Sequence, residues 1–268
     1  MRISALRLSD EACCMQPPEV IELTPPYGTD VTLLATKVTD WHLGDVPLAQ
    51  PAEVATFVTS KRRHEHLTGR WLLGQALRKW GVSDLSVVEV VRDEHRAPSL
   101  LYIQGVWKRT ALPNISITHS EGMAFLALTH PGRAVGLDAE PLDRTLAENA
   151  FDMMAKGVEL EALRGSPQHV FQAWTGKEAV QKCLGLGMHL NPREIEIPIG
   201  LGKKNISIGN SKIQLVYWAE IGYHLSLALR PEAPSKTSPE ERILEETRLA
   251  MQADPDWGVG CKTQRRGA

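Results

Sequence analysis

The sequence contains few cysteines, little net charge and no long hydrophobic run. Its four cysteines lack C-x-x-C spacing, and Cys13 and Cys14 are adjacent, which suits neither a zinc site nor a disulfide framework. A net charge of -2 gives no general case for a nucleic-acid or membrane partner. No apolar run reaches the roughly 18 residues of a membrane helix, and the N-terminus has no secretory apolar segment. These absences predict a soluble cytoplasmic protein that binds neither nucleic acid nor membrane.

Glycine-rich nucleotide-binding signatures are also missing, since neither G-x-G-x-x-G nor a Walker loop occurs. The 268 residues, of which 43% are hydrophobic and 23% charged, are enough for one large or two small globular domains. Helical patterns alternate with strands that are mostly linked as hairpins. The sequence therefore predicts an α+β fold with antiparallel sheets rather than a doubly wound nucleotide-binding fold.

Hydrophobic periods and turn residues locate the individual elements. Strands are expected at 31–38, 85–91, 99–103, 133–140, 195–199, 206–208, 212–218 and 223–229, and as a hairpin over 114–129. Helices are expected from about 52, over 60–80 with Gly81 at its end, around 151–154 and 158–163, and from 170. Residues 1–30 are interpreted as a leader or a peripheral arm, and 233–268 as a polar tail with a charged helix at 239–251.

The strand predicted at 133–140 carries two carboxylates on one face. Side chains alternate along a strand, so Gly136, Asp138 and Glu140 point the same way. Two carboxylates one residue apart repel each other unless a cation or water separates them, and Gly136 leaves room beside them. From these residues alone, an exposed strand end and a metal site are both open.

The helix predicted from Val170 has a charged stripe. Trp174, Glu178 and Lys182 recur at a spacing of four residues, and Lys177 lies next to Glu178. An ordinary surface Glu/Lys pair on an amphipathic helix explains this pattern. The alternative is a helix that places its glutamate on a metal ion and its lysines on an anionic substrate.

Two further segments offer donors for an anion. The helix over 60–80 concentrates Lys61, Arg62, Arg63 and Arg70, either as a solvated basic face or as an anion site. Thr118, His119 and Ser120 lie beside the Glu121-Gly122 turn, where they either serve the turn or meet a ligand.

Taken together, the carboxylates of Asp138, Glu140 and Glu178 form the kind of oxygen-only ligand set that suits Mg²⁺. Lys177, Lys182 and the basic helix would then neutralise phosphates. Metal-assisted transfer of a phosphate-linked group fits these residue types best. A metal-dependent phosphohydrolase, with water as the nucleophile, uses the same carboxylates.

Val135-Gly-Leu-Asp-Ala-Glu140, followed 40 residues after Asp138 by Glu178 within Trp174-Thr-Gly-Lys-Glu-Ala-Val-Gln-Lys182, resembles the signature of 4′-phosphopantetheinyl transferases. Three upstream pieces resemble the longer, surfactin-synthetase-activating (Sfp-type) branch of that family. They are Arg70-Trp-Leu-Leu-Gly74, Arg96-Ala-Pro98 and Ile117-Thr-His-Ser120. The resemblance extends from residue 60 to residue 229.

The resemblance implies two pseudo-symmetric halves in one monomeric chain, residues 1–132 and 133–232, before the tail at 233–268. It also implies transfer of the phosphopantetheine arm of coenzyme A to a serine of an acyl or peptidyl carrier protein, with release of 3′,5′-ADP. Asp138, Glu140 and Glu178 would hold Mg²⁺, and Asp138, Glu178 and Lys182 would be catalytic, with Glu178 helping to deprotonate the serine. The implied coenzyme A contacts are Lys61, Arg62, Arg70, Arg96, Thr118, His119, Lys177 and Lys182.

The sequence departs from the family pattern at three places. Ala97 stands where the family has lysine or arginine, with Arg96 one place earlier. Thr118 replaces a serine, and the Gly185-Leu-Gly187 turn lacks the lysine often found there. These departures predict altered coenzyme A contacts rather than loss of the metal centre. They also keep open a non-catalytic homologue that only binds coenzyme A or a carrier protein, although the intact carboxylates argue against it.

Overall fold

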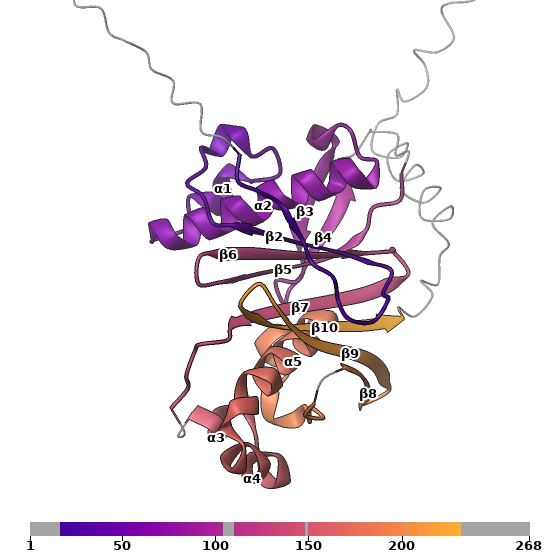
Figure 1. Cartoon of the computed structure of the whole chain (residues 1–268). Helices are drawn as coiled ribbons and strands as arrows, with labels where there is room; N and C mark the ends of the chain where they lie inside the picture. The colour runs from indigo at the N-terminus through magenta and orange to yellow at the C-terminus, as the bar shows by residue number, and fades with distance from the viewer. Residues whose placement is uncertain (1–16, 104–109, 148–149, 201, 232–268) are drawn as a thin grey trace, which may run out of the picture.

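The structure is a computed structural model that describes residues 17–103, 110–147, 150–200 and 202–231. Two antiparallel sheets lie face to face between helix α2 (Ser60–Trp80) and helix α5 (Val170–Cys183), which gives four layers (Figure 1). The predicted α+β class with antiparallel sheets is confirmed. Residues 1–16 and the predicted tail, with its helix at 239–251, lie outside the described residues.

The first sheet has the strand order β1-β2-β6-β5, and α2 covers its outer face (Figure 1). Its strands are β1 (Ile21–Glu22), β2 (Val31–Lys37), β5 (Asn114–Ser120) and β6 (Met123–Thr129). A short helix α1 (Pro51–Val54) precedes α2, and a separate hairpin of β3 (Val88–Arg92) and β4 (Pro98–Tyr102) follows it. Helix α2 ends at Gly81, whose φ of 103° lies in the left-handed region that glycine adopts without strain.

The second sheet has the order β7-β10-β9-β8, and α5 covers its outer face (Figure 1). Its strands are β7 (Arg133–Pro141), β8 (Gly202–Ile208), β9 (Ser211–Glu220) and β10 (Tyr223–Pro231). Helices α3 (Phe151–Met154) and α4 (Gly157–Gly165) lie between β7 and α5 in the chain. The predicted boundary at 132/133 falls in the turn between β6 and β7, which joins the two sheets, and the division into domains stays a prediction.

Three apolar layers hold these elements together. Phe125 and Leu33 from the first sheet pack against Leu137 and Leu227 from the second, which forms the core between the sheets. Val135, Leu137 and Ala139 all belong to this core, which confirms the alternation predicted for the 133–140 strand. A second cluster fills the space between α2 and the first sheet, and a third fills the space between α5 and the second sheet. Residues 134–139 of β7 are therefore buried on both faces of the strand.

The prediction of a strand at 195–199 is wrong. This segment runs extended without a strand partner, although Ile195 and Ile197 are buried in the α5 cluster. Side chains bind its backbone instead, since Ile197 N donates to Glu159 and Ile195 O accepts from Lys177. Pro198, which has no N–H group, cannot take part in a regular ladder.

Several other boundaries differ from the prediction, and the strand predicted at 206–208 begins at Gly202. Residues 85–87 form a 3-10 turn, so the predicted 85–91 strand begins only at Val88. The end of the predicted N-terminal arm contributes strand β1, which pairs with β2 at the edge of the first sheet. Along the described part of the chain, no helix is both long and apolar enough to span a membrane.

Candidate active site

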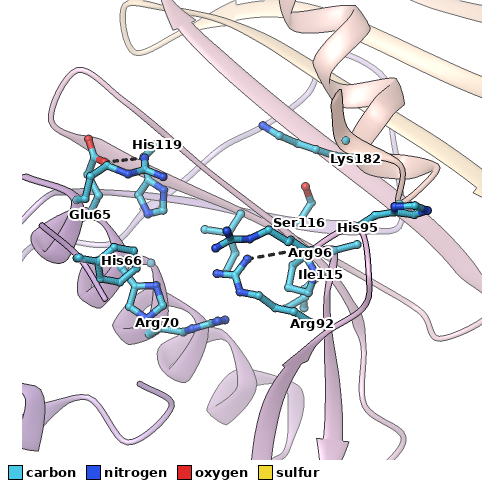
Figure 2. A pocket seen from close by; sticks show the side chains of 18 residues that line it. Glu65, His66, Arg70, Arg92, His95, Arg96, Ile115, Ser116, His119 and Lys182 are labelled. Carbon is cyan, nitrogen blue, oxygen red and sulfur yellow. Dashed lines mark hydrogen bonds and ion pairs between the residues drawn. The ribbon is translucent and has the colours of Figure 1, made fainter. Parts of the chain in front are cut away.

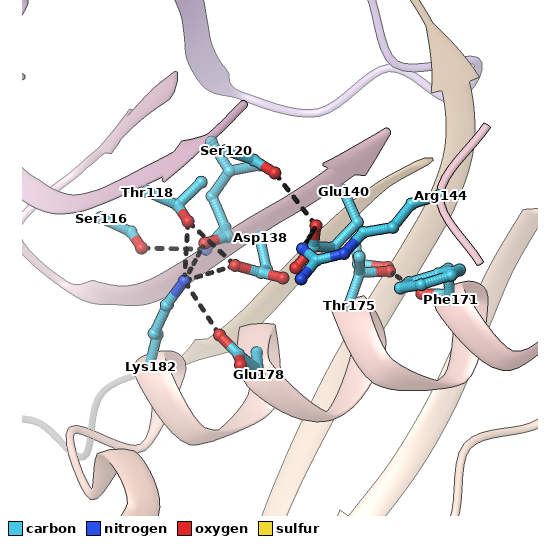
Figure 3. A network of polar contacts seen from close by, with 12 residues as sticks. Ser116, Thr118, Ser120, Asp138, Glu140, Arg144, Phe171, Thr175, Glu178 and Lys182 are labelled. Atoms are coloured by element: carbon cyan, nitrogen blue, oxygen red, sulfur yellow. Dashed lines mark hydrogen bonds and ion pairs between the residues drawn. The ribbon is translucent and has the colours of Figure 1, made fainter. Parts of the chain in front are cut away.

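Helix α5 lies directly on strand β7 because Gly136 has no side chain. A Cβ atom on Gly136 would lie 1.9 Å from the carbonyl oxygen of Ala179 and 2.5 Å from the amide nitrogen of Cys183. The backbones of helix and strand therefore touch at this point. Because Glu178 and Lys182 flank this contact on α5, the close approach brings both side chains onto Asp138 of β7 (Figure 3).

The Lys182 ammonium group lies between two carboxylates. Its Nζ donates to Asp138 Oδ1 at 2.6 Å and lies 3.6 Å from Glu178 Oε2. It also donates to Thr118 Oγ1 at 3.0 Å and to the Leu137 carbonyl at 3.2 Å (Figure 3). The second Asp138 oxygen, Oδ2, is buried without a hydrogen-bond partner. The cluster therefore holds a cation and keeps an unused buried acceptor beside it.

The charged groups in this cluster change one another's pKa values. Burial, together with the nearby carboxylates of Asp138 and Glu140, raises the pKa of Glu178 to about 7, although Lys182 opposes the shift. Burial alone would lower the pKa of Lys182, but Asp138 and Glu178 together raise it. Lys182 is therefore protonated at neutral pH, and Glu178 has a pKa at which it can take up or release a proton.

The third predicted metal ligand, Glu140, has other partners. Its carboxylate accepts a hydrogen bond from Ser120 at 3.0 Å and forms an ion pair with Arg144 (Figure 3). Among the described residues, no three His, Cys, Asp or Glu side chains converge closely enough to hold a metal ion as they stand. The set of Asp138, Glu140 and Glu178 thus stays a prediction. The chemistry of the set fits a divalent metal ion, because its ligand atoms are carboxylate oxygens and Asp138 Oδ2 has no partner. The Lys182 ammonium between Asp138 and Glu178 shows that a positive charge is already held there.

A cationic pocket adjoins this cluster. Its volume is about 430 Å³, and its charged lining comes mainly from α2 and from the hairpin of β3 and β4 (Figure 2). The cationic and imidazole groups that line it are Arg62, His66, Arg70, Arg92, His95, Arg96, His119 and Lys182. Gly185 and Gly187, which follow α5, also line the pocket and lie next to the 93–97 loop. Lys182 therefore belongs both to the pocket and to the carboxylate cluster.

Glu53 on α1 fixes the orientation of two pocket arginines. It pairs with Arg92 at 2.7 Å and with Arg70 at 3.4 Å. Arg92 also donates to the Arg96 carbonyl, which ties it to the loop that carries Arg96 (Figure 2). The sequence prediction missed both Glu53 and Arg92. The only available signal was the charge of the 92–96 loop, because nothing in the sequence spacing links α1 to that loop.

His119 lies against α2 at a position where only glycine fits. A Cβ atom on Gly69 would lie 2.7 Å from His119 Nε2. That nitrogen is buried and has no hydrogen-bond partner, so it is available to a ligand of the pocket. Burial, followed by the charges of Lys182 and Arg62, lowers the pKa of His119 to about 3. The ring is therefore neutral in the structure.

The structure brings five of the eight predicted coenzyme contacts to the pocket: Arg62, Arg70, Arg96, His119 and Lys182. Their roles stay predictions. Lys61 does not line the pocket, and its exposed side chain lies 4.0 Å from Glu65. Thr118 faces β7 rather than the pocket, and donates to Asp138 Oδ1 at 2.9 Å.

The structure places Lys177 away from the pocket, because its side chain is fully buried on another face of α5. Its ammonium group donates to Glu159 at 2.7 Å and to the carbonyl groups of Pro192 and Ile195. All three donors are thus used inside the fold. Lys177 thus ties the 3-10 turn at Pro192–Glu194 and the residue after it to α5, which is a structural role.

Sequence comparison agrees with the class that the carboxylates and the pocket indicate. Residues 134–227 match the family model described as ACPS, the 4′-phosphopantetheinyl transferase superfamily. No curated protein sequence matches the chain. The matched region contains β7, α5 and most of the second sheet, and so contains Asp138, Glu140, Glu178 and Lys182. A domain of this superfamily indicates phosphopantetheine transfer in general, with coenzyme A as substrate and typically a divalent metal ion. The upstream pieces at 70–74, 96–98 and 117–120 lie outside the match, so the Sfp-type branch stays a prediction.

Proposed function

We propose that the protein transfers the 4′-phosphopantetheine group of coenzyme A to a serine of an acyl or peptidyl carrier protein, with Mg²⁺ as cofactor and 3′,5′-ADP as the second product. The observation that carries this proposal is the double position of Lys182. Its ammonium contacts Asp138 and Glu178, while its side chain lines the cationic pocket. This arrangement suits a polyanionic substrate whose reacting phosphate has to reach the carboxylates.

In the proposed reaction, the serine hydroxyl oxygen of the carrier protein forms a bond to the phosphorus that bears the pantetheine arm. The bond from this phosphorus to the bridging pyrophosphate oxygen breaks, and its electron pair leaves with 3′,5′-ADP. Glu178 takes the serine proton, directly or through water. The nucleophile belongs to the partner, so the chain itself needs none.

The residues of the chain divide this work by position. Arg62, Arg70, Arg92 and Arg96 bind the phosphates of coenzyme A in the pocket, and His119 binds at its nucleotide end. Lys182 stabilises the charge that develops on the leaving pyrophosphate oxygen. Asp138, Glu140 and Glu178 are the residues that would hold Mg²⁺, which supplies charge neutralisation on the pyrophosphate.

The test is a panel of apo carrier proteins from fatty-acid, polyketide, nonribosomal-peptide and lysine pathways, each incubated with the protein, coenzyme A and Mg²⁺. Intact-mass spectrometry is expected to show a phosphopantetheine adduct on at least one carrier and 3′,5′-ADP in equal amount. The adduct should be missing when Mg²⁺ is removed by chelation.

Two other outcomes would contradict the proposal. Release of inorganic phosphate from a phosphate ester, with no adduct on any carrier, would establish a metal-dependent phosphohydrolase. Saturable coenzyme A binding in calorimetry, with neither adduct nor phosphate release, would establish a non-catalytic binding protein.

A further inference from the structure

Strand β5 presents a row of hydroxyl groups to strand β7. Ser116, Thr118 and Ser120 are spaced two residues apart and therefore share one face of the strand. All three residues are buried. The intervening residues Ile117 and His119 point to the α2 side, where Ile117 joins the apolar layer and His119 meets Gly69.

Each hydroxyl group of this row has a partner at one position of β7. Ser116 Oγ accepts from the Leu137 amide at 2.9 Å, which fixes the backbone next to Asp138. Thr118 Oγ1 donates to Asp138 Oδ1 at 2.9 Å, and Ser120 Oγ donates to Glu140 Oε2 at 3.0 Å (Figure 3). The β5 and β7 strands are edges of different sheets, so these side chains link the two sheets at the candidate active site.

We propose that Thr118 and Ser120 are positioning residues, whose hydroxyl groups set the orientation of the Asp138 and Glu140 carboxylates for binding of a divalent metal ion. The inference rests on the proposed metal-dependent function and assigns to Thr118 a role different from the coenzyme contact implied by family resemblance. Thr118 does not line the cationic pocket, whereas its neighbour His119 does.

The geometry explains how a hydroxyl group can act in this way. Thr118 Oγ1 accepts from the Lys182 ammonium at 3.0 Å and uses its single proton on Asp138 Oδ1. Thr118 and Lys182 both donate to Asp138 Oδ1, so Oδ2 remains buried without a partner. A buried oxygen without a partner is unfavourable unless a ligand uses it. The hydroxyl thus holds the carboxylate with its free oxygen available to a cation.

Because the row of hydroxyl groups lies on β5, the orientation of the two carboxylates depends on the part of the chain before β7. Asp138 and Glu140 lie within the region that matches the superfamily model, but Thr118 and Ser120 lie before it. Groups that orient metal ligands through hydrogen bonds typically change metal affinity by about 10–100-fold when removed. The expected effect of losing Thr118 is therefore on the metal ion and not on coenzyme A.

The experiment compares Thr118→Val, which keeps the shape but removes the hydroxyl group, with Thr118→Ser, which restores it. Mn²⁺ binding is followed by EPR with saturating coenzyme A, against a coenzyme-only blank, and the KM for coenzyme A is measured separately. We expect Thr118→Val to raise the Kd for Mn²⁺ by about 10-fold or more and to change the KM for coenzyme A by less than about twofold. Thr118→Ser should return the Kd close to that of the wild type.

Ser120→Ala provides the second test, and Thr36→Val the matched control. Thr36 is a buried threonine of the same sheet whose hydroxyl group donates to the Glu19 carbonyl, far from the site in the strand order. Ser120→Ala should weaken Mn²⁺ binding, whereas Thr36→Val should not. Circular dichroism confirms that each variant is folded, and Ser120→Ala keeps the proposal testable if Thr118→Val does not fold.

The possible failures are distinct. An unchanged Kd for Mn²⁺ in Thr118→Val, or a raised KM for coenzyme A with normal Mn²⁺ binding, would overturn the positioning role while leaving the metal centre intact. No saturable Mn²⁺ binding by the wild-type protein would overturn the metal centre itself and the inference that rests on it.

Discussion

Asp138 is the residue on which the candidate site depends most. It is almost fully buried, binds Lys182 and Thr118 through one oxygen and leaves the other without a partner. A buried carboxylate normally requires compensation by charge or hydrogen bonds. The incomplete compensation at Asp138 indicates that the residue is kept for a ligand rather than for stability.

We therefore expect Asp138→Ala to abolish Mg²⁺-dependent transfer to a carrier protein while leaving the protein folded. The physical reason is the loss of one metal ligand and of the main partner of Lys182. The measurement is adduct formation by intact-mass spectrometry, with circular dichroism to monitor folding. Asp152→Ala is the matched control, because Asp152 forms only an exposed ion pair with Arg164. Full activity in Asp138→Ala would eliminate the metal assignment.

Two histidines at the pocket predict how stability depends on pH. Burial and neighbouring cations lower the pKa of His66 to about 4 and that of His119 to about 3. Both folded-state values lie below the ordinary value near 6.5, so the unfolded chain takes up protons first as the pH falls. The unfolding free energy is therefore undiminished by these histidines above pH 6.5, and it decreases as the pH falls toward 4.

Each histidine is expected to cost about 1–2 kcal/mol of unfolding free energy between pH 7.5 and pH 5. Urea unfolding at both pH values measures this loss in the wild type and in His66→Asn. The difference in unfolding free energy between pH 7.5 and pH 5 should be smaller in the variant. If the variant keeps the full pH dependence of the wild type, His66 is not the responsible group.

At the scale of the elements, the close contact between α5 and β7 determines the site. Gly136→Ala would place a methyl group within 1.9 Å of a backbone carbonyl of α5, where no flexible side chain can move aside. We expect a loss of about 1–3 kcal/mol or more in unfolding free energy, together with a large drop in transfer activity as Glu178 and Lys182 move away from Asp138.

Gly132→Ala is the control for this prediction, because a Cβ atom on Gly132 meets nothing within 4 Å. Urea unfolding and carrier modification are measured for both variants. A Gly136→Ala protein with the stability and activity of Gly132→Ala would show that the helix does not need to touch the strand.

Helix α5 also carries two lysines in different surroundings, Lys182 at the pocket and Lys177 inside the fold. Lys177→Met removes one member of a buried ion pair and leaves Glu159 without its partner, so a loss of about 3–5 kcal/mol in unfolding free energy is expected. The KM for coenzyme A should not change in the folded fraction, since Lys177 does not reach the pocket. Urea unfolding and steady-state kinetics test both statements, and a raised KM with normal stability would restore the phosphate role.

The outcome for these two lysines illustrates what the sequence can and cannot predict. The alternation of β7 places Asp138 and Glu140 on one face, and the spacing along α5 places Glu178 and Lys182 on one stripe. The family resemblance then links the two motifs. The same spacing cannot reveal a partner that lies far away in the chain. Lys177 finds Glu159, Arg92 finds Glu53 and Thr118 finds Asp138 only after the layers are stacked. The 195–199 segment was misassigned for the same reason, because side chains satisfy its backbone.

At the scale of the whole molecule, both sheets contribute to one site. The pocket takes its arginines from the first half and Lys182 from the second, while hydroxyl groups of β5 bind the carboxylates of β7. The facing sheets also share a single apolar core that includes Phe125 and Leu137. One chain therefore supplies both sides of the site.

This arrangement predicts that the second half does not function alone, even though it contains all three proposed metal ligands. A fragment of residues 133–232 would expose the core face of its sheet to water and would lose Thr118, Ser120 and the pocket arginines. We expect the fragment to bind hydrophobic dyes, to self-associate in light scattering and to lack transfer activity, while the full chain elutes as a monomer. A folded, monomeric and active fragment would show that the first half contributes neither to the core nor to the site.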